Sequence, residues 1–249
     1  MATTAAERIG AFADWGREYD RSMPGRSLAV VALLLAFAAG CGGASGPSAE
    51  QIVARSAEKV SALRSFHVLV HVENVPASTS GVSLTFVDGD LAVPDRLRAK
   101  IAGTLQGVPL TSELIVVGDR YFLKNPFTGK WQTVSIAMRA VTFFDPAKGV
   151  LAVIRHASGL EKDGSEDVGG VACHRLKGKV RADAVTPLLG NEASATMVPV
   201  ELWIGKRDSL LRRIRLSGPL SPGEPADAVR TVELSAFDEP VQVAAPPVG

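Results

Sequence analysis

The sequence predicts an α+β domain built on one large, curved antiparallel sheet, a half-barrel with helices packed on its concave face. Apolar residues alternate with polar ones over many short segments separated by turn residues, which is typical of antiparallel strands. Helical spacing occurs before the first strands and again between two groups of strands. A sheet of so many strands is expected to curl. The space that it encloses with the helices is either a filled core or a cavity.

A short apolar run near the N-terminus predicts export. Residues 28–39 fit the roughly 7–15 residues of a secretory signal core and are too short for a spanning helix, which needs about 20. Arg26 precedes the run, and Ala38-Ala39-Gly40-Cys41 follows it. This ending resembles the lipobox of bacterial lipoproteins, in which the cysteine receives a diacylglycerol before cleavage, although Ala38 replaces the usual leucine. The alternatives are an ordinary signal peptide and an uncleaved anchor.

The chain is expected to fall into five segments. Residues 1–22 carry acidic side chains, unlike a basic n-region, so they are either a mis-annotated start before Met23 or an extended n-region. The other segments are a lipoprotein signal peptide (23–40), an acylated Cys41 with a flexible tether (41–47), the folded domain (48–240) and a Pro-rich tail (241–249) that is expected to fray.

The domain is expected to begin with a helix and continue with strands. Ser48 and Gln51 have the spacing of a capping box, and the apolar stripe that follows predicts a helix to about Arg64. From residue 66 the period changes to two, which predicts a strand with one wet face. Its apolar face is Phe66, Val68, Val70 and Val72, and its polar face is His67, His71 and Glu73.

Further strands are predicted around residues 83–87, 96–101, 114–117, 121–123 and 131–134. In the first of these, Leu84 and Phe86 are expected to share one face. A helical pattern follows at 136–144, and Asp145-Pro146 is expected to begin another helix, whose apolar stripe includes Leu151 and Ile154.

The last third of the domain is predicted to return to strands. Residues 159–170 are expected to form an acidic loop, and strands are predicted at 171–180, 198–204, 210–217 and 229–237, with a short helix at 183–189. Within residues 210–217, Leu210, Ile214 and Leu216 are expected to lie opposite Leu211, Arg213 and Arg215.

Composition argues against several functions. The net charge of +1 gives no sign of a nucleic-acid surface. Cys173 has no disulfide partner if Cys41 is acylated, so a small buried apolar role is expected. His67 and His71 lie about 13 Å apart along a strand, too far for one metal. The acidic segment does not match a calcium loop, and neither Gly-x-Ser-x-Gly nor His-Glu-x-x-His is present. No enzyme, cofactor or metal site is predicted.

Four sequence blocks, together with the lipobox, resemble the LppX/LprG-type (LppX_LprAFG) envelope lipoproteins of mycobacteria and related bacteria. The resemblance spans nearly the whole mature chain. The blocks are residues 144–151 (FDPAKGVL), 168–178 (VGGVACHRLKG), 201–213 (ELWI running into LLRR) and 231–241 (TVELSAFDEPV).

The resemblance implies a LolA-like half-barrel, similar to the periplasmic lipoprotein carriers, closed by helices around an apolar cavity. It also implies a lipid-anchored protein on the extracytoplasmic face of the membrane. Such a protein would carry acylated lipids or lipoglycans across the envelope, as a monomer served by a lipid exporter or acceptor. The alternative is a sensor or interaction scaffold on the same fold.

The candidate site residues follow from that expectation. Burial of each methylene in a bilayer contributes roughly 0.8 kcal/mol, which is on the order of 10 kcal/mol for a sixteen-carbon chain such as palmitate. The apolar site of a carrier must offer the chain a comparable free energy of burial. The cavity-lining candidates are Phe66, Val68, Val70, Leu84, Phe86, Phe143, Phe144, Leu151, Ile154 and Leu202. Since inward faces of curved sheets are ordinarily filled, each of them also fits a core role. Arg212, Arg213 and Arg215 are the candidates for contact with a membrane or lipid headgroup, or else form a solvated strand face.

Overall fold

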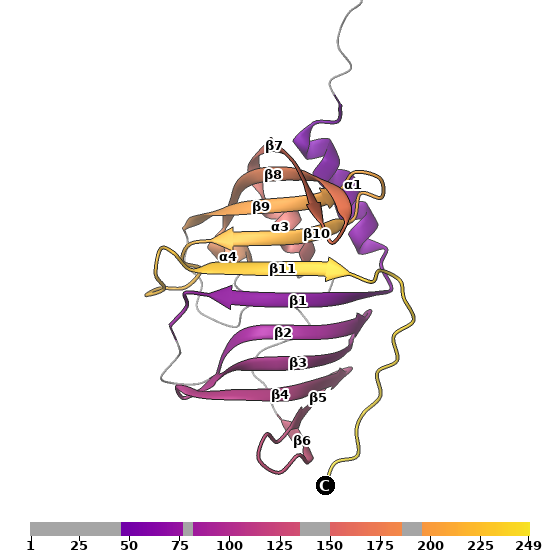
Figure 1. Cartoon of the computed structure of the whole chain (residues 1–249), viewed down its shortest axis with the longest axis vertical. Helices are drawn as coiled ribbons and strands as arrows, with labels where there is room; N and C mark the ends of the chain where they lie inside the picture. Colours follow the sequence, from indigo (N-terminus) through magenta and orange to yellow (C-terminus); the bar gives the residue numbers. More distant parts are fainter. Residues whose placement is uncertain (1–45, 77–81, 135–149, 186–195) are drawn as a thin grey trace, which may run out of the picture. The chain divides into compact units, whose positions relative to one another are not determined.

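The computed structural model describes residues 46–76, 82–134, 150–185 and 196–249. Eleven strands form one antiparallel sheet in the order β6-β5-β4-β3-β2-β1-β11-β10-β9-β8-β7 (Figure 1). The predicted α+β half-barrel class is therefore confirmed. Residues 1–45, which include Cys41 and the predicted signal peptide, lie outside the described residues.

Two meanders make up the sheet, β1 to β6 and β7 to β11, and they join where β1 pairs with β11. The strands are β1 (Ser65–Glu73), β2 (Val82–Ala92), β3 (Arg96–Leu105), β4 (Val108–Val117), β5 (Arg120–Lys124), β6 (Trp131–Val134), β7 (Ser158–Val168), β8 (Val171–Arg181), β9 (Met197–Gly205), β10 (Leu211–Ser217) and β11 (Val229–Ser235). The described helices are α1 (Ala49–Ser61), α3 (Val150–His156) and α4 (Ala182–Val185).

The helices pack on one face of the sheet, over its β7–β11 half (Figure 1). Helix α1 contacts β7 and β9, whereas α3 and α4 contact β8. The predicted capping box starts α1: Gln51 N donates to Ser48 Oγ (3.2 Å), and Ser48 N donates to Gln51 Oε1 (3.0 Å). The helical pattern at 136–144 and the predicted cap at Asp145-Pro146 lie outside the described residues.

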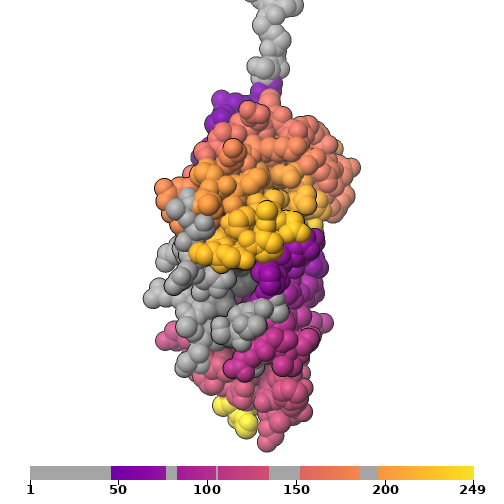
Figure 2. Space-filling view, turned by 90° about the vertical axis from the view of Figure 1, so that its left-hand side faces the viewer, coloured from indigo at the N-terminus to yellow at the C-terminus, as the bar shows by residue number. Residues whose placement is uncertain are grey.

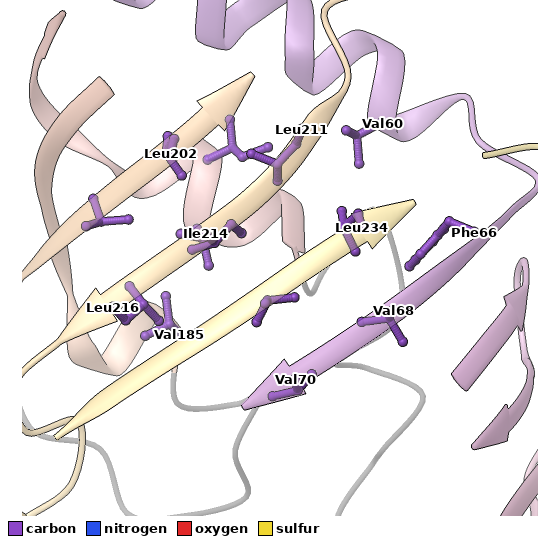
Figure 3. Packing of buried hydrophobic residues seen from close by; sticks show 14 of the residues in the cluster. Val60, Phe66, Val68, Val70, Val185, Leu202, Leu211, Ile214, Leu216 and Leu234 are labelled. Atoms are coloured by element: carbon purple, nitrogen blue, oxygen red, sulfur yellow. The ribbon is translucent and has the colours of Figure 1, made fainter. Parts of the chain in front are cut away.

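The inner face of the sheet, which faces these helices, holds the main core. On β1, Val68 lies opposite Leu234 of β11 and Val70 opposite Val232, so these side chains share that face. Figure 3 shows the same row continuing through Ile214 and Leu216 on β10 to Leu202 on β9.

A bulge in β2 corrects the predicted face of Phe86. Leu84 pairs with Gly103 on the inner face, but the register shifts before Phe86, which pairs with His71 on the outer face. The two rings meet edge to face, with centroids 5.1 Å apart. Gly103 permits this bulge, because a Cβ at that position would lie 2.1 Å from the Ser83 carbonyl oxygen.

A second bulge, in β10, corrects the predicted face of Leu211. The register with β9 shifts between Leu211 and Arg213, so Leu211 and Ile214 both enter the main core although they lie three residues apart. The bulge accommodates Arg212, the basic residue that interrupts the apolar alternation of this strand.

The predicted acidic loop at 159–170 is wrong, because most of this segment is the edge strand β7. Its side chains are mostly exposed on both faces, and its pairing with β8 is interrupted twice. Gly169 and Gly170 make the turn to β8 with φ of 57° and 78°, as a two-residue hairpin turn requires. A charged, irregular edge of this kind discourages pairing with other chains.

The prediction of a frayed C-terminal tail is also wrong. Val243 is 5% exposed and packs with Ile115 and Phe122 on the outer face of β4 and β5. Arg96 Nη1 donates to its carbonyl oxygen at 3.2 Å, and Val248 forms a bridge with Trp131. The valines of the tail thus cover apolar side chains that would otherwise be exposed.

Candidate functional site

The candidate site is the apolar inner face of β1 to β5. The described helices lie over the other half of the sheet (Figure 1). The inward rows of β2 to β5 are nevertheless as apolar as those beneath these helices. These rows consist of Val87 and Leu91 on β2, Leu97, Ala99 and Ile101 on β3, Leu114 and Val116 on β4, and Tyr121 and Leu123 on β5.

Burial of the inward rows decreases toward one end of the sheet. On β1, Phe66 and Val68 are 1% and 0% exposed, Val70 is 6% exposed, and Val72 is only partly buried. The other strands show the same trend: on β3 the exposed fraction rises from 1% at Leu97 to 7% at Ile101. The inner face is therefore fully buried at one end, whereas at the other end its side chains are slightly more exposed and Val72 is only partly buried.

We call this less buried end the rim. It comprises the end of β1, the start of β2, the β3–β4 and β5–β6 turns, the start of β9 and the β10–β11 loop. Figure 2 faces this end, where the β10–β11 region (yellow) lies at the surface. Asn74 Nδ2 donates to the Asp227 carbonyl oxygen at 3.0 Å, which ties the end of β1 to the loop.

Three of the four large exposed apolar residues among those described lie at the rim. Val108 is 64% exposed at the start of β4, Phe127 is 91% exposed in the β5–β6 turn, and Met197 is 47% exposed at the start of β9. The fourth, Val248, belongs to the tail. Single exposed apolar residues are ordinary on protein surfaces, but here they gather at the end where the inner face is less buried.

The predicted lining residues take different places. Phe66, Val68, Ile154 and Leu202 are at most 1% exposed and pack as core side chains. Val70 and Leu84 lie on the inner face near the rim, and Phe86 lies on the outer face. Phe143, Phe144 and the Leu151 side chain lie outside the described residues. Val70 and Leu84 are thus the predicted residues best placed to contact a ligand entering at the rim.

A buried ion pair at the rim was not predicted from the sequence. Arg230 of β11 lies opposite Val72 and Leu216, so it belongs to an inward apolar row, and it is 5% exposed. Its Nη2 lies 2.5 Å from Glu224 Oε1 in the β10–β11 loop, and Glu224 Oε2 accepts from Leu220 N at 2.8 Å. The available signal was the position of this arginine, in phase with Val232 and Leu234.

The three arginines predicted to contact a membrane or headgroup all pair within the chain. Arg212 bonds Asp208 and lies over the Phe237 ring. The other two pair across strands: Arg213 Nε lies 2.7 Å from Glu233 Oε1, and Arg215 Nη1 lies 3.8 Å from Glu201 Oε1. Each of the three arginines thus has an acidic partner within the chain, although Arg212 Nε is buried without a hydrogen-bond partner among the described residues. Their contact with a membrane stays a prediction.

Groups that commonly carry catalysis or bind metal occupy structural positions. His67 lies on the outer face, 2.8 Å from Asp90 and 3.5 Å from Asp88. Cys173 is buried, and this burial raises the pKa of its thiol, which lowers its reactivity. Within the described ranges no group of three or more His, Cys, Asp or Glu is arranged to hold a metal, and no helix has the length and apolarity to span a membrane.

Comparison with known proteins gives one consistent relationship. The sequence model of the LppX_LprAFG lipoproteins matches residues 48–243. The lipoarabinomannan carrier protein LprG of Mycobacterium leprae is 28% identical over 239 residues, covering 90% of this chain and 96% of the relative. LprG of Mycobacterium tuberculosis H37Rv is 27% identical over 236 residues, covering 89% and 94%.

Two solved structures share the fold. LprF of Mycobacterium bovis superimposes with a TM-score of 0.65 at 21% identity, covering 82% of this chain and 100% of the other. LppX of Mycobacterium tuberculosis gives a TM-score of 0.57 at 21% identity, covering 79% and 98%.

Proposed function

The chain belongs to the LppX_LprAFG lipoprotein family, and on this premise we propose that it binds an acylated lipid or lipoglycan on its inner face and carries it across the cell envelope. The observation that carries the proposal is the apolar inner face of β1 to β5, whose burial decreases toward the rim. Acyl chains would lie along the inward rows and the headgroup at the rim. No catalytic step is part of this function.

Lipid energetics support an enclosed apolar site. Removing a sixteen-carbon chain from a bilayer costs on the order of 10 kcal/mol, and only contact with a comparable apolar area offsets that cost. The inward rows of five strands supply such an area. The names of the LprG relatives, lipoarabinomannan carriers, support a lipoglycan as the ligand class.

The exposed apolar residues at the rim suggest how lipid would enter. A carrier has to bring the mouth of its site to the bilayer surface, and exposed apolar side chains at the mouth favour that contact. Phe127, Val108 and Met197 are so placed. A sensor or interaction scaffold would bind lipid without moving it. An assay of lipid transfer between membranes therefore distinguishes a carrier from a sensor or scaffold.

We predict that the protein accelerates transfer of a fluorescent acylated lipid from donor to acceptor vesicles, and that Phe127→Ser slows this transfer several-fold at unchanged equilibrium binding. The phenylalanine is 91% exposed, so its loss weakens bilayer contact with little effect on folding. The control is Val171→Ser, in the β7–β8 hairpin at the opposite end of the sheet. Binding without accelerated transfer would contradict the carrier function and favour the sensor or scaffold.

We also propose that Cys41 anchors the protein through a diacylglycerol, with the domain held near the extracytoplasmic face of the membrane. Metabolic labelling with an alkyne-tagged palmitate is expected to label the wild-type chain and Cys173→Ala fully and to leave Cys41→Ala unlabelled. The second cysteine is buried and so serves as the matched control. An unlabelled wild-type chain would instead indicate an ordinary signal peptide or an uncleaved anchor.

A further inference from the structure

The Arg230 guanidinium has an unused hydrogen-bond donor inside the protein. Of its two terminal nitrogens, Nη2 donates to Glu224, whereas Nη1 is buried and has no hydrogen-bond partner among the described residues. Leaving a buried donor without an acceptor is costly, and more so when the donor group is charged. An unpaired donor of this kind, at the rim of an otherwise apolar face, is therefore a candidate for contact with a ligand.

A second unpartnered polar atom lies in the adjoining loop. Ser221 is 9% exposed, and its Oγ is buried with no hydrogen-bond partner in the described ranges. It follows Leu220, whose backbone N–H donates to the same Glu224 carboxylate that pairs with Arg230. Both residues with an unpartnered polar atom thus bond Glu224: its backbone N–H donates to the Ser221 carbonyl oxygen at 3.2 Å, and its carboxylate accepts from Arg230.

The charge balance at this position selects the kind of acceptor. The Glu224 carboxylate already neutralises the guanidinium, and the side chains of the pair are 9% and 6% exposed. A second anion would bring uncompensated charge into a poorly solvated place. A neutral carbonyl oxygen satisfies the donor without adding charge.

We propose that Arg230 Nη1 donates a hydrogen bond to an ester carbonyl oxygen of the bound acylated lipid. This inference rests on the proposed function and specifies its ligand contact. In an acylated lipid the ester joins the apolar chains to the polar headgroup, and Arg230 lies where the apolar row of Val232 and Leu234 meets the rim. The arginine therefore sets how deep the lipid sits and selects ester-linked chains.

The test compares ester with ether lipids of the same chain length. Dipalmitoylglycerol and dihexadecylglycerol differ in the two carbonyl oxygens, and each competes against a fluorescent acylated lipid for the purified protein. We expect wild type to prefer the ester by about tenfold. Arg230→Lys keeps a cation beside Glu224 but loses Nη1, and it is expected to reduce the preference to about twofold with ether binding unchanged. Arg98→Lys, on the outer face of β3, should keep the wild-type preference.

The outcomes separate the inference from the function on which it rests. Equal preference in wild type and Arg230→Lys overturns the role of the arginine while lipid binding stands. An effect of Arg230→Lys confined to dipalmitoylphosphatidylglycerol identifies the phosphate as acceptor and overturns the ester assignment. Failure of wild type to bind either lipid overturns the proposed function and the inference together. If Arg230→Lys does not fold, Ser221→Ala is measured in the same assay, because it removes the second unpartnered polar group of the site.

Discussion

Leu84→Trp is expected to reduce the amount of lipid bound per chain at least tenfold, whereas Phe86→Trp is expected to leave it unchanged. Leu84 lies on the inner face near the rim and is only partly buried, so an indole there occupies space that acyl chains need. The thermal midpoint should fall little, because a partly exposed position tolerates the larger ring better than a filled core does. Lipid extracted from the purified variants measures the effect.

Phe86 is a well-matched control because it is two residues away on the same strand and faces the other way. Its ring contacts His71 on the outer face, so a larger ring there meets no ligand. If Leu84→Trp lowered thermal stability as much as it lowered lipid content, the inner face near the rim would be ordinary core. Equal loss of lipid in both variants would mean that the ligand does not lie on the inner face.

Arg230→Met is expected to destabilise the protein by about 3–5 kcal/mol, because breaking a buried ion pair leaves one charge uncompensated. The charge left behind is that of Glu224, whose side chain is 9% exposed. The double variant Arg230→Met/Glu224→Gln removes both charges and should recover much of the loss. Urea denaturation of the three proteins gives the free energies of unfolding.

The outer-face pair of Arg215 with Glu201 provides the comparison for this effect. The arginine side chain is 45% exposed and its nitrogen lies 3.8 Å from the carboxylate. Arg215→Met should therefore cost less than about 1 kcal/mol, because the arginine is exposed and Glu201 keeps Arg175 Nη2 at 2.5 Å. A similar small cost for Arg230→Met would mean that water reaches the Arg230–Glu224 pair, which contradicts the buried rim contact.

Alternation in the sequence was enough to predict the sheet but not its irregularities. The β1 strand was predicted correctly because one face packs in the core and the other is wet, so its side chains alternate in polarity. The bulges in β2 and β10 each shift the phase by a residue, and pairing with a neighbouring strand decides where that happens. Phe86 and Leu211 were assigned to the wrong face for this reason.

Other elements gave no usable local signal. The β7 strand is exposed on both faces, so its composition resembles that of a loop. The tail is ordered by contacts with Ile115 and Phe122, more than a hundred residues away in sequence. At the candidate site, periodicity placed Val70 on the inner face, but the pairing of Arg230 with Glu224 depends on a loop whose path no local pattern predicts.

The most direct test of lipid binding on the inner face is native mass spectrometry of the chain purified without detergent. The domain should be exported behind an ordinary cleavable signal peptide in a bacterium whose envelope contains acylated glycolipids, so that the mature form begins after Cys41 and carries no anchor of its own. We predict a complex heavier than the apoprotein by one acylated lipid, which releases acyl chains on fragmentation. Recovery of the apoprotein mass alone would contradict the proposed function.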